Sequence, residues 1–373
     1  MTWTSKFPLS LTLAGLLLSA AGTAAAEIRI AAVGPMTGPL AAFGDQLRRG
    51  AEMAVKDINA RGGLLGEPLV LTVEDDVCDP KQAVAVANRL VGRDIVFVAG
   101  HGCSGCSIPA SRVYEEEGVL MMSPASTAPE LTEAGGDLVF RVAGRDDQQG
   151  GVAAQFIREQ MPKARVAVLH DKSAYGKGLA DETRQKLADL GQTVVFSDAY
   201  NAGEKDYRAV VSRLKEADID LVFIGGYYTE IGLMLRQAKS AGLDATFMAG
   251  DGLMSADFWG IAGGQAEGTL MTFASDPRKT PEARTIVARF KENGIEPEGY
   301  TLYAYATVQV WAQAAEMAGS VDPETVAAAL RGYDFQTVLG EIAFDAKGDV
   351  SVPGFVVYRW SEGSYTYATG LTN

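Results

Sequence analysis

The fold is decided by the stretch Gly34-Pro-Met-Thr-Gly-Pro-Leu-Ala-Ala-Phe-Gly-Asp-Gln46 and by the helical segment after it, which ends at Gly62-Gly63. A short apolar run at 28–33 precedes the stretch and predicts a strand. Apolar residues then recur at spacings of four, three and four from Leu47 to Ile58, which predicts one buried face of a helix. A glycine pair is typical of a helix C-terminus. This order places a ligand-binding lip at the carboxyl end of the strand, where open α/β sheets bind small molecules.

Strand-like and helix-like segments alternate through most of the remaining chain. This rhythm predicts βαβ units, and therefore parallel sheets flanked by helices on both faces. Further strands are predicted at 69–73, 95–99, 119–122, 138–142, 165–169, 193–196, 221–224, 246–249 and 268–272. Further helices are predicted at 80–90, 107–117, 148–159, 174–190, 207–216, 230–241, 281–293 and 299–318.

The pattern falls into two blocks, 28–122 and 165–249, which predicts two Rossmann-like lobes rather than one. It changes near residues 141–145, 272–277 and 351–353. Three such changes predict three crossings between the lobes, and together they would form a hinge in a protein that closes on its ligand. We expect lobe 1 to hold residues 27–142 and 275–352, and lobe 2 to hold residues 143–274 and 353–373.

Residues 1–26 have the pattern of a cleaved secretory signal peptide, with Lys6 before a short apolar core and Ala24-Ala25-Ala26 at the cleavage site. No later segment approaches the length of a transmembrane helix, so we expect an exported protein without direct membrane insertion. The chain has 33 Lys and Arg residues against 47 Asp and Glu, and a net charge of −14 at pH 7. This acidity argues strongly against nucleic acid as a partner and weakly against anionic membranes.

The three cysteines leave three interpretations open. Cys78 and Cys103 follow neighbouring predicted strands, so a disulfide between them is sterically plausible in an oxidising compartment and would leave Cys106 as a free thiol. Cys103-Ser-Gly-Cys106 is also a Cys-x-x-Cys sequence at a strand-to-helix turn, as in redox-active proteins. His101 with all three cysteines would suit a zinc site. We favour the disulfide with a free thiol, and expect no metal.

The segment Gly102-Cys-Ser-Gly-Cys106 comes one residue short of Gly-x-Ser-x-Gly, the nucleophile elbow of hydrolases. The histidines available are His101, in the same turn as Ser104, and His170, in the other predicted lobe. A Ser-dependent hydrolase is therefore a remote alternative. The sequence also lacks the glycine-rich motifs of phosphate-binding and dinucleotide-binding loops, and we expect no cofactor.

Polar groups follow two predicted strands of the first block. Ser104 lies between a strand and a helix, where its hydroxyl and the exposed backbone N–H groups suit a carboxylate. In the next such turn, Thr127 can donate to a carboxylate or accept from an amine, and the Ala125 carbonyl can accept from an ammonium. Both segments are also typical of ordinary turns and helix caps. The prediction of a binding site therefore depends on the second block as well.

The second block presents Tyr175, Tyr227 and Asp251 just beyond the carboxyl ends of its strands. An acid there pairs with an ammonium, and the tyrosines would wall an apolar side chain. Singly, a tyrosine is more often a packed surface residue and Asp-Gly more often a turn. Their convergence with Ser104 and Thr127 on one cleft predicts a site for a small zwitterion.

Taken together, these residues resemble the periplasmic leucine/isoleucine/valine-binding proteins of ABC transporters, which have the type I periplasmic-binding fold. The resemblance runs over nearly the whole chain after the leader. Its most specific segments are Gly44-Asp-Gln46, Asp57-Ile-Asn-Ala-Arg-Gly-Gly63, Asp75-Asp-Val-Cys-Asp-Pro-Lys-Gln-Ala-Val-Ala-Val-Ala-Asn88, Ser123-Pro-Ala-Ser-Thr-Ala-Pro-Glu-Leu131, His170-Asp-Lys172 with Tyr175-Gly176, and Gly225-Gly-Tyr227.

The resemblance implies a role for each of these positions. The ligand carboxylate would be held by Ser104 and Thr127, and its ammonium by the Ala125 carbonyl, Thr127 and Asp251. Aromatic residues would line the side-chain pocket, and a disulfide would join two of the cysteines. These aromatic residues are Phe43, Tyr175, Tyr227 and Tyr300, and the cysteines are Cys78 and Cys103.

Three residues depart from the family pattern. The acid at Asp251 is usually Glu, one methylene longer, so the ammonium contact would shift or recruit water. Gly102 stands where a bulky aliphatic residue is common, which predicts room for a larger ligand such as phenylalanine. Cys106 replaces the usual polar residue.

The expected function is that of a periplasmic, monomeric solute-binding protein without enzymatic activity. It would capture a neutral, by preference branched-chain, L-amino acid between its lobes and deliver it to an inner-membrane ABC permease. The alternatives are the same fold binding an aromatic amino acid, an amide or urea, and the same fold acting as a sensor.

Overall fold

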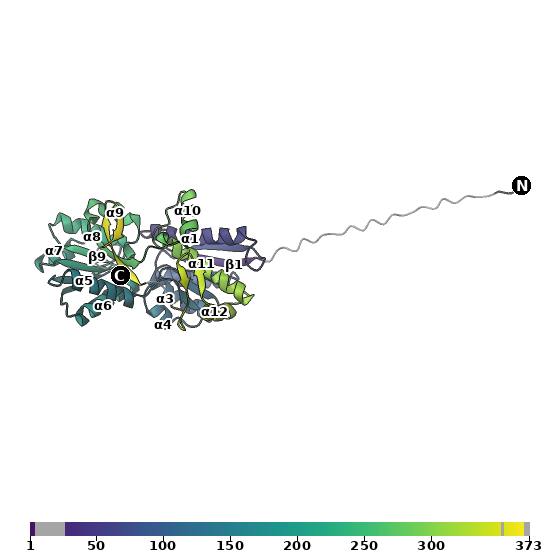
Figure 1. Cartoon of the computed structure of the whole chain (residues 1–373), viewed down its shortest axis with the longest axis horizontal. Helices are drawn as coiled ribbons and strands as arrows, with labels where there is room; N and C mark the ends of the chain where they lie inside the picture. The colour runs from purple at the N-terminus through teal and green to yellow at the C-terminus, as the bar shows by residue number, and fades with distance from the viewer. Residues whose placement is uncertain (4–26, 352–353, 369–373) are drawn as a thin grey trace.

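The computed structural model describes residues 1–3, 27–351 and 354–368. The predicted signal peptide lies outside the described residues except for residues 1–3. The described chain forms two α/β lobes that lie side by side, with the chain running back and forth between them (Figure 1). Across these residues, no helix combines the length and the apolar character that crossing a bilayer requires.

Lobe 1 is built on a parallel sheet with the strand order β2-β1-β3-β4-β5. The central strands β3 and β4 are fully buried and mostly apolar, as expected for a sheet covered by helices on both faces. The strands are β1 (Ile28–Gly34), β2 (Leu69–Asp75), β3 (Phe97–Ala99), β4 (Leu120–Ser123) and β5 (Val139–Arg141). The helices of this lobe are α1 (Ala41–Ala60), α2 (Pro80–Val91), α3 (Ser104–Glu116), α4 (Glu130–Glu133), α10 (Arg284–Glu292), α11 (Thr301–Ala318) and α12 (Pro323–Gly332).

Lobe 2 is built on a mixed sheet with the order β14-β13-β10-β9-β8-β6-β7. Strands β6 to β10 pair in parallel, as predicted. They are β6 (Val166–His170), β7 (Val194–Ala199), β8 (Leu221–Gly225), β9 (Thr246–Ala249) and β10 (Leu270–Ala274). The helices of this lobe are α5 (Asp146–Gln160), α6 (Ala174–Asp189), α7 (Arg208–Glu216), α8 (Tyr228–Ser240) and α9 (Ala256–Ala262).

The expectation of parallel sheets is wrong at one edge of lobe 2. There β13 (Phe355–Ser361) pairs antiparallel with β10, and β14 (Ser364–Tyr367) pairs antiparallel with β13. Glu362 and Gly363 both have positive φ and join β13 and β14 in a two-residue hairpin turn. A second short hairpin, β11 (Phe335–Thr337) with β12 (Gly340–Ile342), lies in lobe 1. The strands of each hairpin are joined by only two residues, and so short a connection can link only antiparallel strands.

The order of the elements brings both lobes to one cleft. After β5 the chain enters α5, which packs against α6 and β13 of lobe 2. After β10 it returns to lobe 1, where α11 packs against α1 and β3, and it then crosses again to β13. Tyr305 of α11 donates to Asp57 Oδ2 of α1 at 2.9 Å. The loops after β1, β3, β4, β6, β8 and β9 all begin at carboxyl ends of parallel strands, where α/β sheets bind ligands.

Candidate functional site

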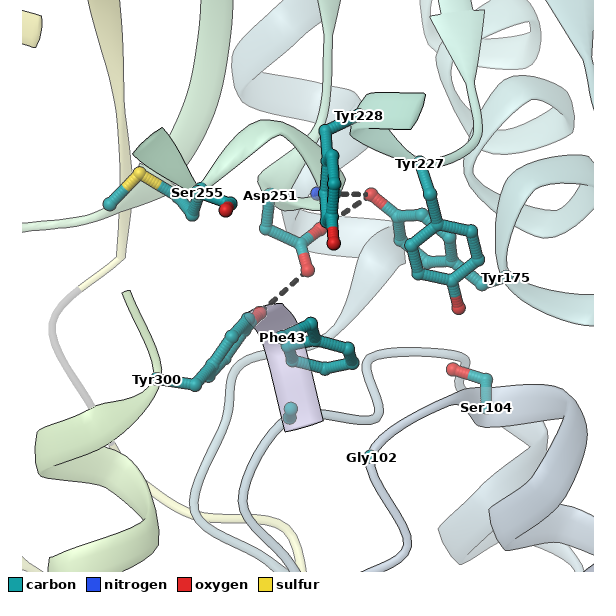
Figure 2. Close-up of a pocket in the computed structure, with 12 residues that line it drawn as sticks. Phe43, Gly102, Ser104, Tyr175, Tyr227, Tyr228, Asp251, Ser255 and Tyr300 are labelled. Atoms are coloured by element: carbon teal, nitrogen blue, oxygen red, sulfur yellow. Dashed lines mark hydrogen bonds between the residues drawn. The ribbon is translucent and has the colours of Figure 1, made fainter. Parts of the chain in front are cut away.

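A cavity with an empty volume of about 380 Å³ lies between the lobes. It contains eight of the nine predicted ligand-binding residues, with side chains from the two lobes facing one another (Figure 2). From lobe 1 it is lined by Phe43, Gly102, Ser104, Ala125 and Tyr300. From lobe 2 it is lined by Tyr175, Tyr227, Tyr228, Asp251, Gly252, Met254 and Ser255.

Ser104 is the first residue of α3, whereas the sequence predicted a helix from Ser107. Proline favours the first turn of a helix, and Pro109 would occupy that turn if the helix began at Ser107. The real helix begins a turn earlier, so Ser104 stands at its amino-terminal, partly positive end. Ser104 is buried, and its Oγ accepts a hydrogen bond from the Ala128 N–H at 3.2 Å. The first N–H groups of a helix have no carbonyl partner within it and are suited to an anion.

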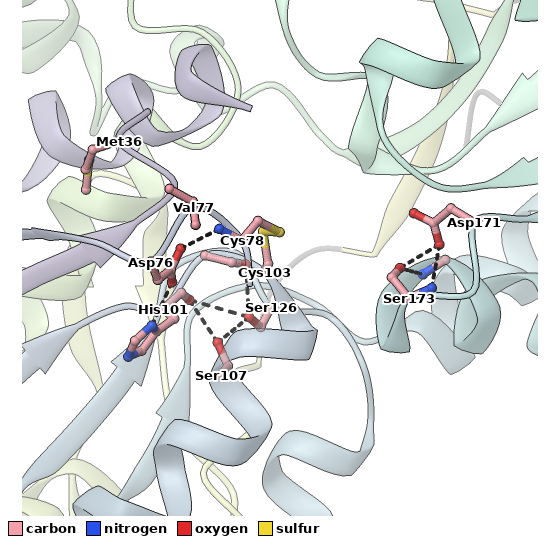
Figure 3. Close-up of a disulfide and its surroundings, with 12 residues drawn as sticks. Met36, Asp76, Val77, Cys78, His101, Cys103, Ser107, Ser126, Asp171 and Ser173 are labelled. Atoms are coloured by element: carbon pink, nitrogen blue, oxygen red, sulfur yellow. Dashed lines mark hydrogen bonds and ion pairs between the residues drawn. A yellow bond between two sulfur atoms is a disulfide. The ribbon is translucent and has the colours of Figure 1, made fainter. Parts of the chain in front are cut away.

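The turn before Ser104 is held by buried polar contacts (Figure 3). The His101 carbonyl accepts from Ser123 Oγ at 2.7 Å and from Ser107 Oγ at 3.0 Å. The His101 ring contacts Asp76 Oδ2 through Nδ1 at 2.7 Å and Tyr114 Oη through Nε2 at 3.1 Å. Both ring nitrogens are therefore engaged away from Ser104. The hydrolase alternative lacks its general base at this turn.

The cysteines form the predicted disulfide. Cys78 and Cys103 are bonded, with their Cα atoms 5.8 Å apart. The Cys103–Cys106 redox interpretation is wrong because Cys103 is paired with Cys78, and the same bond removes two ligands from the zinc interpretation. Cys106 is a buried free thiol. Burial, with the negative charge of Asp76, raises the pKa of this thiol, which disfavours the reactive thiolate.

Asp251 is the acid of the cavity. It begins a short 3₁₀ turn after β9 and is buried. Its Oδ1 accepts from the Tyr175 hydroxyl at 2.8 Å, and its Oδ2 accepts from the Tyr300 hydroxyl at 2.6 Å. The Gly252 N–H donates to the Tyr175 hydroxyl at 2.9 Å. Burial raises the pKa of Asp251, and the hydrogen bonds from Tyr300 and Tyr175 oppose that rise by stabilising the carboxylate.

Aromatic rings wall the rest of the cavity. Phe43 stands edge-on to Tyr300 with ring centroids 5.7 Å apart, and Tyr175 lies 5.1 Å from Tyr227. The segments that carry Tyr175 and Tyr227 approach each other closely at Gly176 and Gly225. A Cβ on Gly225 would lie 1.9 Å from the Gly176 carbonyl oxygen, so no larger residue fits there. The sequence interpretation missed the lining residues Tyr228, Gly252, Met254 and Ser255. These four residues are neighbours of Tyr227 and Asp251 in the sequence, and that proximity was the only signal from which they could have been predicted.

The predicted room beside Gly102 is not free. A Cβ placed on Gly102 would lie 2.6 Å from Leu47 Cδ1 and 3.1 Å from Phe43 Cε1. The space that a larger residue would occupy is therefore filled by two side chains of α1. The positions of Leu47 and Phe43 argue against the expectation that Gly102 widens the pocket for a ligand such as phenylalanine, which stays a prediction.

Thr127 is the one predicted site residue that does not line the cavity. It is fully buried, and its backbone carbonyl accepts from the Asp146 N–H at 2.9 Å. Among the described residues, its Oγ1 has no hydrogen-bond partner. Thr127 thus lies behind the cavity wall, next to the start of α5.

Direct hydrogen bonds join the two lobes around the cavity. The Pro39 carbonyl of the lip accepts from the Tyr228 hydroxyl at 3.1 Å and from Thr229 Oγ1 at 3.0 Å. Gln46 donates from Nε2 to the Met254 carbonyl at 2.9 Å, while its Oε1 accepts from a backbone N–H of lobe 1 at the start of α11. The structure is therefore in a closed conformation, in which the lip (residues 34–46) is hydrogen-bonded to the start of α8.

A second buried acid, Asp171, lies in the turn between β6 and α6, four residues before Tyr175 of α6 (Figure 3). Its Oδ1 accepts from the Ser173 N–H at 2.8 Å and from Ser173 Oγ at 2.6 Å. Burial raises the pKa of Asp171 from 3.8 to about 6, the hydrogen bonds from Ser173 oppose that rise, and the charge of Glu230 adds to it.

We expect Asp171→Asn to remove part of the pH dependence of stability. Because its folded-state pKa is raised, the folded protein binds this proton more tightly than the unfolded chain does. The resulting stabilisation, up to about 3 kcal/mol, is fully present below about pH 4 and is lost as the pH rises through about 6. Urea unfolding from pH 3.5 to 8 measures the difference between wild type and variant. Asp189→Asn, the same substitution at an exposed position of α6, is the control. If the difference in unfolding free energy between wild type and Asp171→Asn is the same at every pH, the raised pKa does not belong to Asp171.

The chain matches the periplasmic binding protein family over residues 27–364. It is 47% identical over 350 residues to Leu/Ile/Val-binding protein homolog 1 of Brucella suis, with 93% of this chain and 94% of the relative covered. It is 46% identical over 338 residues to the leucine-, isoleucine-, valine-, threonine- and alanine-binding protein of Pseudomonas aeruginosa, with 90% and 91% covered.

Two solved structures are similar over nearly their whole length. A leucine-binding protein from Thermotoga maritima superposes with a TM-score of 0.85 at 30% identity and covers 92% of this chain and 98% of its own. A branched-chain amino acid transporter substrate-binding protein from Streptococcus pneumoniae, solved in complex with isoleucine, has a TM-score of 0.83 at 27% identity and covers 91% and 98%. The two-lobed architecture, the cavity between the lobes and the match over residues 27–364 agree: this chain belongs to the periplasmic binding protein family, whose members are solute-binding proteins.

Proposed function

We propose that this protein binds a branched-chain L-amino acid in the cavity between its lobes and delivers it to an ABC permease. One observation carries the proposal: an acid with two tyrosine donors faces a helix amino-terminus across a small aromatic cavity. Those two poles match the ammonium and the carboxylate of a zwitterion. The names of the relatives in Brucella suis and Pseudomonas aeruginosa support the same ligand class.

The carboxylate would bind at the start of α3. Ser104 offers its hydroxyl there, and the backbone N–H groups of Ser104 and Gly105 begin the helix. Hydrogen bonds from several N–H and O–H groups to a carboxylate are stronger than neutral ones and offset its desolvation. Because the Ser104 Oγ already accepts from Ala128, its hydrogen is free to point elsewhere.

The ammonium would bind near Asp251 and the Ala125 carbonyl. Asp251 is held in place by Tyr175 and Tyr300, which come from different lobes. An ammonium in the cavity would supply the positive charge that a buried carboxylate requires. Aspartate is shorter than glutamate, and the hydrogen bond to Tyr300 shows that it still reaches across the cleft.

The ligand side chain would lie against Phe43, Tyr228, Met254 and Tyr300. These groups are aromatic or aliphatic on the faces that line the cavity, which suits a branched aliphatic side chain. Phe43 and Leu47 fill the space beside Gly102, so the cavity favours leucine, isoleucine and valine over phenylalanine. The different-ligand and sensor alternatives have no observation in their favour.

Closure would be the mechanism of capture. A ligand held by Ser104 in lobe 1 gains contacts from Tyr175, Tyr227 and Asp251 of lobe 2 only in the closed state, so binding shifts the population toward closure. The hinge would be the three segments that link the lobes, with the boundaries expected from the sequence. No enzymatic chemistry is required, since the permease complex would use ATP.

We expect the hydrogen bonds to the Pro39 carbonyl to contribute to affinity, separately from the Tyr228 ring that lines the cavity and is kept in Tyr228→Phe. Tyr228→Phe with Thr229→Val removes both hydrogen bonds to the Pro39 carbonyl, which join the two lobes and would break if the lobes moved apart. At about 0.5–1.5 kcal/mol for each bond, the double variant should bind L-leucine roughly 5- to 100-fold more weakly in calorimetry. Tyr207→Phe removes a tyrosine hydrogen bond within lobe 2 and is the control, expected to leave affinity unchanged. Equal affinities of the double variant and wild type would contradict the contact's role.

Thermal unfolding against a panel of ligands tests the ligand class. The protein, freed of co-purified ligand by unfolding and refolding, is heated with each of the twenty L-amino acids and with D-leucine. A ligand at a thousandfold excess over its Kd adds about 4 kcal/mol to the free energy of unfolding and raises the melting temperature by several degrees. Shifts confined to leucine, isoleucine and valine support the proposal. A larger shift with phenylalanine, or none with any amino acid, contradicts it.

Export and delivery belong to the same proposal. The predicted signal peptide would be cleaved after Ala26, and the protein would act in the periplasm as a monomer. Loss of radiolabelled leucine uptake on deleting the gene, restored by the wild-type gene, would support transport. Unchanged uptake with a lost response to leucine would favour the sensor instead.

A further inference from the structure

A cluster of buried polar atoms behind the cavity has no partners. Among the described residues, Thr127 Oγ1, both carboxylate oxygens of Asp146 and Gln149 Oε1 make no hydrogen bond of normal geometry, although the Thr127 hydroxyl lies close enough to Asp146 to oppose the rise of its pKa. All three residues are fully buried. Asp146 and Gln149 lie one turn apart on α5, and the Asp146 N–H donates to the Thr127 carbonyl at 2.9 Å. Nearly all buried polar groups in proteins are hydrogen-bonded, so this cluster lacks a partner group.

The missing partner must be rich in donors. Gln149 is fixed in orientation because its Nε2 donates to the Thr272 carbonyl and to Thr272 Oγ1, both at 3.0 Å. Its Oε1 and the two oxygens of Asp146 are acceptors, and Thr127 can supply one hydrogen only. The nearby guanidinium of Arg141 is occupied by the carbonyls of Ser126 and Ala128 and by Asp349. A primary ammonium, with three hydrogens and a positive charge, is the group that fits.

The cluster is electrostatically part of the cavity. After burial, the charge of Asp251 is the next cause of the raised pKa of Asp146. Beyond the effect of burial, the charge of Asp146 in turn contributes to the raised pKa values of Tyr175, Tyr227 and Tyr300, all of which line the cavity. Two buried carboxylates at one site repel each other, and a cation between them stabilises both.

We propose that Asp146 is the second acid of the ammonium site, and that the α-ammonium of the ligand binds between Asp251 and the Thr127–Asp146 pair, meeting Asp146 directly or through one water. This inference rests on the proposed function and adds a residue that the ligand set above does not contain. It also gives Thr127 a role. When the ammonium donates to Thr127 Oγ1, the Thr127 hydroxyl can donate its own hydrogen to the Asp146 carboxylate. The pair therefore selects an amine over a hydroxyl at the α-carbon.

The test compares two ligands that differ at that group. Calorimetry with L-leucine and with (S)-2-hydroxy-4-methylpentanoate, in which a hydroxyl replaces the ammonium, gives a ratio of affinities. Asp146→Asn keeps the size of the side chain and removes its charge, and should weaken L-leucine binding about 10- to 100-fold while leaving the hydroxy acid nearly unchanged. Asp147→Asn makes the same change one residue along, where the side chain pairs with Arg145, and should leave the ratio as in wild type. An unchanged ratio in Asp146→Asn overturns the inference.

A second measurement needs no variant. In a crystal structure of the wild-type protein with L-leucine, the ammonium nitrogen, or one water bonded to it, should lie within hydrogen-bond distance of an Asp146 oxygen. A leucine complex in which Asp146 bonds only to protein atoms overturns the inference and leaves the proposed function standing. A wild-type protein that binds no amino acid overturns both.

Discussion

Replacing Asp251 with Asn should weaken L-leucine binding by about 30- to 1,000-fold without destabilising the ligand-free protein. Removing one partner of a buried charge pair costs about 2–4 kcal/mol of binding free energy. The ligand-free protein responds differently because burial raises the pKa of Asp251, which means that its ionised form is disfavoured in the fold. Asn removes that charge and keeps an oxygen that can accept from Tyr175 or Tyr300. Calorimetry measures the first effect, and thermal unfolding without ligand measures the second.

Asp257→Asn is the matched control for this prediction. Asp257 lies on the same segment but is exposed and outside the cavity. It should bind L-leucine as wild type does. If Asp251→Asn binds with wild-type affinity, the ammonium does not bind at Asp251, and the orientation of the zwitterion proposed here is wrong.

The second large effect concerns stability. Replacing Cys78 and Cys103 together with Ser should lower the free energy of unfolding by about 3.5 kcal/mol, since the bond closes a loop of 25 residues. For a chain of this length the loss corresponds to a fall in melting temperature of about 5 °C. Affinity should fall as well, because Cys103 is the residue before α3 and holds the turn that presents Ser104. Thermal unfolding under non-reducing conditions and calorimetry measure the two effects.

Cys106→Ala serves as the control because it removes the free thiol and keeps the disulfide. Its loss of stability should be smaller, and its affinity should be that of wild type. In denaturant, the wild-type protein should show one reactive thiol before reduction and three after it. If the Cys78→Ser, Cys103→Ser variant has the same melting temperature as wild type, the disulfide contributes no stability.

The sequence predicted the fold well because its pattern is local and repeated. Alternating strands and helices located β1 to β10 to within a few residues, since each βαβ unit carries its own periodicity and turn signals. The hairpins at 335–342 and 355–367 were missed because short strands joined by a two-residue turn lack the helix that makes a βαβ unit visible. The early start of α3 was missed because residues 103–106 were interpreted as a strand-to-helix turn, whereas the helix begins at Ser104.

The site was predictable only in part, because it depends on contacts between distant segments. Tyr300 and Phe43 were placed by family resemblance, since neither carries a local signal. Gly102 shows the limit most clearly: the sequence shows that a side chain is missing, but not that Leu47 fills the space. The bond from Gln46 to Met254, 208 residues apart, depends on how the lobes close. Asp146 gave no signal because an acid at the start of a helix is ordinary.

The most direct test of the central claim is a calorimetric titration of refolded, ligand-free protein with L-leucine, followed by competition with L-phenylalanine. The account predicts one leucine bound per chain, with L-isoleucine and L-valine binding at the same site and L-phenylalanine failing to displace leucine at comparable concentration. No heat of binding with any branched-chain amino acid, in a protein that is folded and unloaded, would contradict it.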